Sequence, residues 1–199
     1  THEAYVAAIY ALALAAPGLV PTDRDTIRAI KLTYGAGPSG ARGVTYFNRW
    51  QLPAAGQPGH LVAICATEQE SPLQVCGTTL HELGHVLAGP LAGHGADWLA
   101  ACARLGLGDQ SKGCTRIEAA GCNYTWEMFT PELRSALQAI PVPGDGAPCK
   151  AQYAHPASPA LPGPAAGPSI RPCAMGFGTR GGLSRGAGND RLRVVCAEQ

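Results

Sequence analysis

Residues 79–85 read Thr-Leu-His-Glu-Leu-Gly-His, and residues 94–98 read His-Gly-Ala-Asp-Trp. His81 and His85 are four residues apart, so on a helix both imidazoles leave the same face, one turn apart. Histidines at this spacing can bind one zinc ion, and Glu82 beside them can serve as a general base. The motif therefore predicts a zinc-binding helix that carries Glu82 as the candidate catalytic residue.

His94 can reach the same ion only if this helix ends before it. In a continuous helix the nine residues after His85 would turn the chain by about 900° and advance it by about 13 Å, so His94 would face away. Gly89-Pro90 can end the helix, because glycine commonly ends helices and proline cannot extend one from within. We therefore predict a chain reversal there and three zinc ligands, His81, His85 and His94. Asp97 is the alternative third ligand, although it also fits the first turn of a following helix.

The hydrophobic pattern predicts an α+β domain with a small mixed sheet. Apolar residues at helical spacing predict helices over 2–15, 22–31, 72–88, 96–105 and 131–140, with Thr22 and Thr130 as N-caps. Alternating residues predict strands over 44–50 and 60–65. Gly84 is a poor helix former, which indicates that a side chain there would crowd the metal or a neighbouring backbone. Trp98 and Cys102 are interpreted as core residues.

Composition divides the chain into a domain over residues 1–140 and an appendage over 141–199. The appendage is rich in proline and glycine, which predicts a linker or extended segment. Five arginines between Arg171 and Arg193 could contact phosphates, or this stretch could be a solvated tail. The net charge of +1 gives no overall attraction to nucleic acid or membrane, and no apolar run is long enough to span a membrane.

The 8 cysteines leave two compartments open. Their density is below that of a disulfide scaffold, which favours a reducing cytoplasm with buried or metal-bound thiols. If the protein is exported instead, Cys114 and Cys122 are the best disulfide candidates. The apolar stretch from Ala4 to Ala16 lacks the basic residues that begin a signal peptide, so we interpret it as a helix packed on the domain.

Taken together, residues 79–85 and 94–98 resemble the SprT-like (Spartan-type) zinc metallopeptidases, including phage-encoded members. That family combines His-Glu-x-x-His with a third histidine in a His-Gly-x-x-Trp/Phe segment. The resemblance covers about residues 25 to 107, and it implies zinc ligands at His81, His85 and His94 with Glu82 as the catalytic glutamate. The longer metzincin motif does not fit, because it needs a histidine where Leu91 stands.

The resemblance implies a zincin-like fold and a zinc endopeptidase that acts on proteins, including DNA-associated proteins. In zincins an edge strand near the zinc helix pairs with the extended substrate, and residues 60–65 directly precede that helix. The chain departs from the family in one respect, because it contains no Cys-x-x-Cys pair for a zinc ribbon. A second, structural zinc would have to use the remaining candidates Cys149, His155, Cys173 and Cys196.

The sequence leaves open two alternative functions and the identity of the residue that stabilises the oxyanion. The first alternative is a non-catalytic zinc-binding interaction or phage-assembly protein on the same fold. The second is a secreted, disulfide-bonded metallopeptidase. The sequence does not identify the group that stabilises the oxyanion; Tyr46 and Tyr124 are candidates, although packing explains each more simply.

Overall fold

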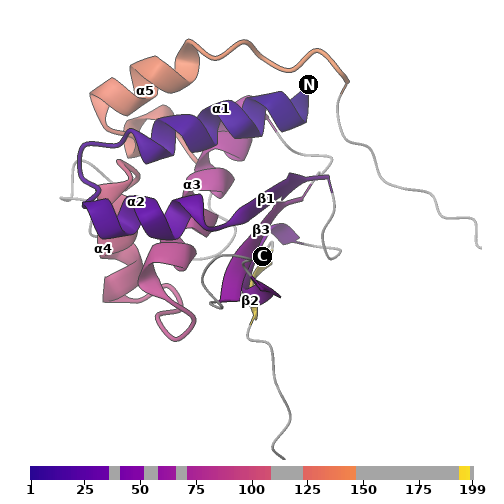
Figure 1. The fold of residues 1–199 in the computed structure, drawn as a ribbon. Coiled ribbons are helices and arrows are strands. Elements are labelled where there is room, and N and C mark those ends of the chain that lie inside the picture. Colours follow the sequence, from indigo (N-terminus) through magenta and orange to yellow (C-terminus); the bar gives the residue numbers. More distant parts are fainter. Residues whose placement is uncertain (36–40, 52–57, 66–70, 109–122, 147–192, 198–199) are drawn as a thin grey trace, which may run out of the picture. The chain divides into compact units, whose positions relative to one another are not determined.

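A computed structural model describes residues 1–35, 41–51, 58–65, 71–108, 123–146 and 193–197 (Figure 1). These residues belong to one compact unit, which comprises Thr1–Lys150 and Arg191–Gln199.

Four strands form one sheet in the order β1-β3-β2-β4. Their bounds are β1 (Lys31–Tyr34), β2 (Ala41–Gln51), β3 (Pro58–Ile64) and β4 (Arg193–Ala197). β3 pairs in parallel with β1 and antiparallel with β2, so these three strands form the mixed core of the sheet. β4, the C-terminal strand, adds to the outer edge of β2 in the antiparallel direction.

Five α-helices accompany the sheet in the described part of the chain, so the predicted α+β class is confirmed. Their bounds are α1 (His2–Leu14), α2 (Pro21–Arg28), α3 (Pro72–Ala88), α4 (Ala96–Arg104) and α5 (Pro131–Gln138). A 3-10 turn covers Trp126–Met128. Local signals fix the start of α3, because the Ser71 side chain accepts a hydrogen bond from the Gln74 amide and Pro72 occupies the first turn.

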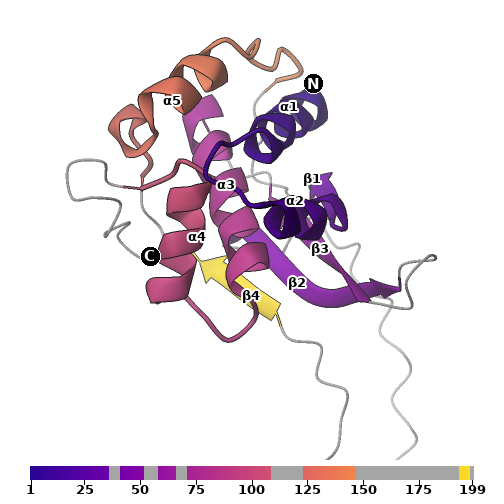
Figure 2. The ribbon, with the colours of Figure 1, turned by 60° about the vertical axis from the view of Figure 1, so that its left-hand side comes forward.

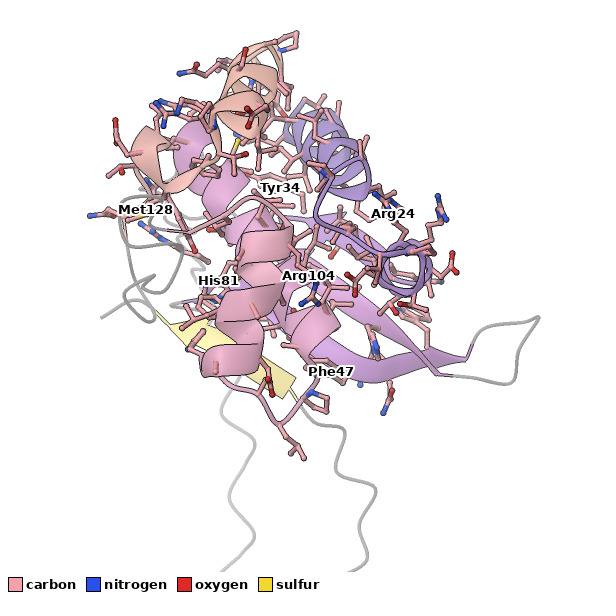
Figure 3. All side chains as sticks on the ribbon, turned by 90° about the vertical axis from the view of Figure 1, so that its left-hand side faces the viewer. Arg24, Tyr34, Phe47, His81, Arg104 and Met128 are labelled. Atoms are coloured by element: carbon pink, nitrogen blue, oxygen red, sulfur yellow. The ribbon has the colours of Figure 1, made fainter. Side chains whose placement is uncertain are left out.

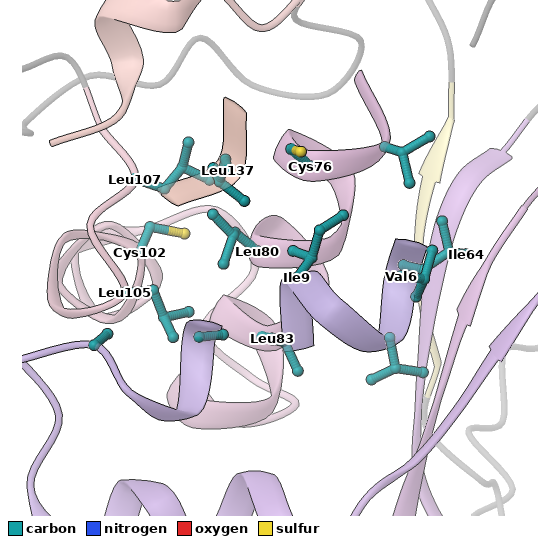
Figure 4. Packing of buried hydrophobic residues seen from close by; sticks show 14 of the residues in the cluster. Val6, Ile9, Ile64, Cys76, Leu80, Leu83, Cys102, Leu105, Leu107 and Leu137 are labelled. Atoms are coloured by element: carbon teal, nitrogen blue, oxygen red, sulfur yellow. The ribbon is translucent and has the colours of Figure 1, made fainter. Parts of the chain in front are cut away.

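α3 runs through the middle of the hydrophobic core (Figure 4). Leu80 and Leu83 of α3 are fully buried, together with Ile9 of α1 and Ile64 of β3. Every residue from Gln74 to Val86 is buried, which is unusual for a helix that carries charged and polar groups. Polar side chains on this helix therefore need partners within the protein.

The expectations for the second helix were wrong at both ends. α2 begins at Pro21 with Val20 as its N-cap residue, whereas Thr22 was expected in that place; the Asp23 carboxylate accepts a hydrogen bond from the Val20 amide. The helix ends at Arg28, and the chain from Lys31 enters β1 instead of extending the helix. Parallel pairing of β1 with β3 overrides the helical pattern here, and no local signal announces that pairing.

The expectation of an edge strand just before α3 was also wrong. β3 lies between β1 and β2, so both of its sides are paired. β1 and β2 are the two edge strands of this three-stranded core, and β4 pairs along the outer side of β2 (Figure 2). β4 comes from the region that was expected to be a linker and tail, and the domain boundary after residue 140 stays a prediction.

The first helix packs on the domain as predicted, with Tyr5, Val6, Ile9 and Ala13 of α1 buried. None of the described helices is both long enough and apolar enough to cross a bilayer.

Candidate metal centre

The chain reverses direction between α3 and α4, as the Gly89-Pro90 step predicted. Gly89 follows the last residue of α3 with a φ of 87°, in the left-handed region that favours glycine, and its amide donates to the carbonyl of His85. Leu91, at the outside of the turn, is 90 % exposed. α4 then starts at Ala96 and packs against α3, and this arrangement returns His94 to the histidines of α3.

Three imidazole nitrogens converge at this point. Nε2 of His85 lies 3.2 Å from Nε2 of His81 and 3.2 Å from Nε2 of His94, and the remaining Nε2 pair is 3.0 Å apart. Ligands of a tetrahedral ion with metal–nitrogen distances of about 2.0–2.1 Å lie about 3.3 Å from one another. The triangle therefore has the size that one shared metal ion requires, and the three side chains could hold a metal ion.

The same three imidazoles are kept neutral, which is the form that binds metals. Burial lowers the pKa of His81 well below its ordinary value, and the neighbouring His85 and His94 lower it further. Burial, followed by the proximity of His94, lowers the pKa of His85 to about 3. Burial also lowers the pKa of His94. Neutral imidazoles whose nitrogen atoms meet at 3.0–3.2 Å suit transition metals rather than the oxygen-preferring Ca²⁺ or Mg²⁺.

Trp98 of α4 forms the wall behind the triad and is fully buried, as expected for a core residue. Its ring centroid lies 4.6 Å from that of His81, 5.5 Å from that of His85 and 4.7 Å from that of His94 (His81 is labelled in Figure 3). Its indole N–H donates to the backbone carbonyl of His81 at 3.3 Å. Trp98 therefore excludes water on one side and fixes the backbone that carries the first ligand.

The atoms nearest to a side chain at Gly84 belong to side chains of α4, whereas the metal or a neighbouring backbone was expected. A Cβ at this position would lie 2.6 Å from Sγ of Cys102 and 3.2 Å from Nε1 of Trp98. α3 and α4 approach each other here because residue 84 has no side chain, and this approach brings Trp98 against the histidines.

Glu82 lies between α3 and β2 and is 0 % exposed. The Thr45 hydroxyl lies 2.7 Å from Oε2 of Glu82 and 3.1 Å from its backbone carbonyl, and both oxygens can accept its hydrogen bond. Gly43, two residues earlier on β2, makes room for this carboxylate, because a Cβ there would lie 2.6 Å from Cγ of Glu82. β2 therefore holds the side chain of Glu82, the candidate general base, in place. Glu82 directly follows His81, the first histidine of the triad, in the sequence.

Tyr124 contacts the triad from the opposite side of the His81 ring. Its hydroxyl lies 3.0 Å from Nδ1 of His81, and the ring is buried. Sequence reasoning considered Tyr124 only for the oxyanion or for packing and missed this contact, which joins residues 43 positions apart. Tyr46, the other oxyanion candidate, packs instead on a small cluster formed by Ala41, Val44 and Cys65.

The remaining sequence candidates lie partly within and partly outside the described residues. Asp97 is exposed in the first turn of α4. Cys114, Cys122, Cys149, His155, Cys173 and the stretch from Arg171 to residue 192 lie outside the described residues. Cys196 and Arg193 lie in β4, where the backbone alone is described. Comparisons with protein-family models, with curated proteins and with solved structures found no match to this chain.

Proposed function

We propose that this protein is a zinc-dependent endopeptidase of the SprT-like type on a zincin-like fold. The observation that carries the proposal is the triangle of His81, His85 and His94 nitrogens at 3.0–3.2 Å, with Glu82 held directly beside the first of them. Three neutral imidazoles are a donor set of catalytic zinc sites, which keep the fourth position for water or substrate. A carboxylate that follows the first ligand supplies the base that such sites need.

When bound, zinc would lower the pKa of a coordinated water and polarise the carbonyl of the scissile bond. Glu82 would take the proton of the attacking water and deliver it to the leaving amine. Thr45 would keep the carboxylate in place through its hydroxyl, and Trp98 would exclude bulk water from the far side of the ligands. We propose proteins in extended form as substrates, including DNA-associated proteins if Arg171–Arg193 contacts nucleic acid.

The test compares the full chain with Glu82→Gln, both loaded with zinc, on unfolded casein and on histone with and without DNA. Glu82→Gln removes the base and leaves all three ligands intact, so one zinc per chain should remain while cleavage is lost. Cleavage that is equal in both chains, or a chain that binds no zinc, would contradict the proposal.

One observation favours the second candidate, a zinc-binding protein without peptidase activity. The Glu82 side chain is 0 % exposed, whereas a general base must meet a water molecule. Stoichiometric zinc with no cleavage by either chain would support this alternative.

Titration of thiols in the denatured, unreduced protein tests the location: 8 free thiols support the cytoplasm, and few support the secreted, disulfide-bonded alternative.

A further inference from the structure

The outer edge of β2 runs beside the candidate catalytic group. Gly43 and Thr45 contact Glu82 with the atoms that face α3, while the backbone of the same residues pairs with two neighbouring strands. β3 pairs along one side of β2 and β4 along the other. An extended chain on that outer side therefore runs directly beside the residues of β2 that contact Glu82.

β4 occupies this stretch of the edge in the antiparallel direction. Gly43 lies opposite Cys196, Val44 opposite Val195, and Thr45 opposite Val194. The register shifts between Ala41 and Gly43, so the regular pairing covers Gly43 to Tyr46, a stretch that includes both residues that contact the carboxylate. Main-chain pairing of this kind accepts almost any sequence, because the hydrogen bonds come from the backbone.

We propose that β4 is an internal competitor that occupies the edge to which an extended substrate binds. This inference rests on the proposed function, since it assigns the substrate-binding strand of that same site. The occupant is the segment Arg193–Ala197 of the chain itself, and a substrate peptide would replace it strand for strand.

β4 competes for this edge as part of the same chain. β4 is five residues long, and 46 residues separate it from Gly146. Because β4 belongs to the same chain as β2, its pairing is intramolecular and corresponds to an effective concentration at the edge. A free peptide of similar intrinsic affinity must approach that concentration before it displaces β4, so the segment raises the substrate concentration that the enzyme needs.

Proline substitutions in the full chain can release β4 selectively. Adjacent residues of an antiparallel strand direct their backbone N–H groups to opposite sides, so of Val194 and Val195 one donates toward β2 and the other points away. Val194→Pro and Val195→Pro form a matched pair: proline removes a hydrogen bond to β2 in one variant and none in the other. Amide exchange at Gly43–Tyr46 identifies the variant that frees the edge.

Binding is measured on zinc-loaded chains that also carry Glu82→Gln, so that no turnover interferes. The probe is fluorescently labelled, unfolded casein, followed by anisotropy. We expect the variant with the freed edge to bind casein about tenfold more tightly than the parent chain, and its matched partner to bind like the parent. A nine-residue peptide with the sequence of residues 191–199 should displace the casein from the freed edge.

Two results would overturn the inference. One is a freed β2 edge that binds casein no better than the parent chain, or from which the nine-residue peptide displaces nothing. The other is unchanged amide exchange in both variants, because pairing of β4 requires one of them to lose a hydrogen bond. Failure of the proposed function appears separately: chains that follow the expected binding pattern but never cleave casein when Glu82 is present would be peptide binders, with β4 still the competitor.

Discussion

The hydroxyl of Tyr124 lies 3.0 Å from Nδ1 of His81, on the side of the imidazole opposite the Nε2 atom that meets the other two histidines. The Tyr124 backbone is fixed by Gln74 of α3, whose side chain accepts from the Tyr124 amide and donates to its carbonyl, both at 3.0 Å. Arg42 of β2 donates to the same Gln74 oxygen at 3.0 Å. When the Nδ1 proton of His81 is donated to Tyr124, the Nε2 lone pair is free for a metal ion.

Tyr124→Phe should therefore weaken zinc binding without removing a ligand. Outer partners of metal-bound histidines typically contribute about 10- to 100-fold in affinity, and we expect a loss in that range. Competition with a chromophoric chelator measures it. Tyr10→Phe is the matched control, because that hydroxyl donates to the carbonyl of Ile27. Equal zinc affinities for the two variants would show that the Tyr124 contact does not orient the ligand.

Gly77→Ala should disturb the contact between the Tyr124 hydroxyl and His81. A Cβ on residue 77 would lie 2.1 Å from Cγ of Tyr124, so the ring must move. Overpacking of this kind costs about 1–3 kcal/mol, and the zinc affinity should fall together with the free energy of unfolding. Gly144→Ala is the control, since a Cβ there meets no atom within 4 Å. Urea unfolding of both variants tests this, and a Gly77→Ala chain as stable as the control would contradict it.

His94→Ala should lose zinc affinity heavily, whereas Asp97→Ala should lose little. His94 contributes one of the three converging nitrogens, and Asp97 is exposed in the first turn of α4. Zinc content after dialysis, with the affinity from chelator competition, separates the two variants. The reverse ranking would make Asp97 the third ligand and would remove the geometric basis of the proposed site.

α3 and the histidine triad could be predicted from the sequence because their signals are local. The start of α3 is marked by Ser71 and Pro72, its end by Gly89, and the face that carries the histidines by the four-residue spacing of His81 and His85. A glycine with φ of 87° at residue 89 is what allows His94 to return. Each of these features lies within one or two turns of the residues that it positions.

The parts that sequence reasoning missed depend on distant partners. β1 forms because residues 31–34 pair with residues 61–64, and Tyr124 meets His81 across 43 positions. β2 carries Gly43 and Thr45 to Glu82 because of its pairing with β3. No sequence pattern indicates that Gly43 and Gly77 must lack a side chain. In both cases the space for a Cβ is taken by a side chain from another part of the chain.

Thr45→Val should keep zinc bound and lower the turnover number. Valine has nearly the same shape but cannot donate to Oε2 of Glu82, so the carboxylate loses the contact that holds it at 2.7 Å. A hydrogen bond to a charged group contributes about 1.5–3 kcal/mol, and a loss of roughly tenfold or more in kcat with little change in KM is the expected result. Thr45→Ser restores the hydroxyl and should restore most of the rate. Unchanged kcat in Thr45→Val would mean that the hydroxyl does not position the base.

Acidification should destabilise the metal-free protein in a defined pH range. The pKa of His85 is lowered to about 3 in the folded chain by burial and by His94, whereas an unfolded histidine has a pKa of about 6.5. Below about pH 6.5 the unfolded chain therefore binds a proton at His85 that the folded chain does not. The contribution of His85 to the free energy of unfolding is full above that pH and falls as the pH decreases toward about 3. Each pH unit below 6.5 should cost about 1.4 kcal/mol from His85, with further losses from His81 and His94, whose pKa values are lowered in the same direction.

Urea unfolding of the chelator-treated chain at pH 7.5 and 5.5 measures this dependence. His85→Ala is the comparison, because it removes one of the buried imidazoles; its loss of stability between the two pH values should be smaller by about 1.4 kcal/mol. The comparison concerns the change with pH alone, so it does not depend on how stable the variant is at pH 7.5. An identical pH dependence with and without His85 would mean that burial does not keep this imidazole neutral. The argument that the three histidines are held in their metal-binding form would then be contradicted.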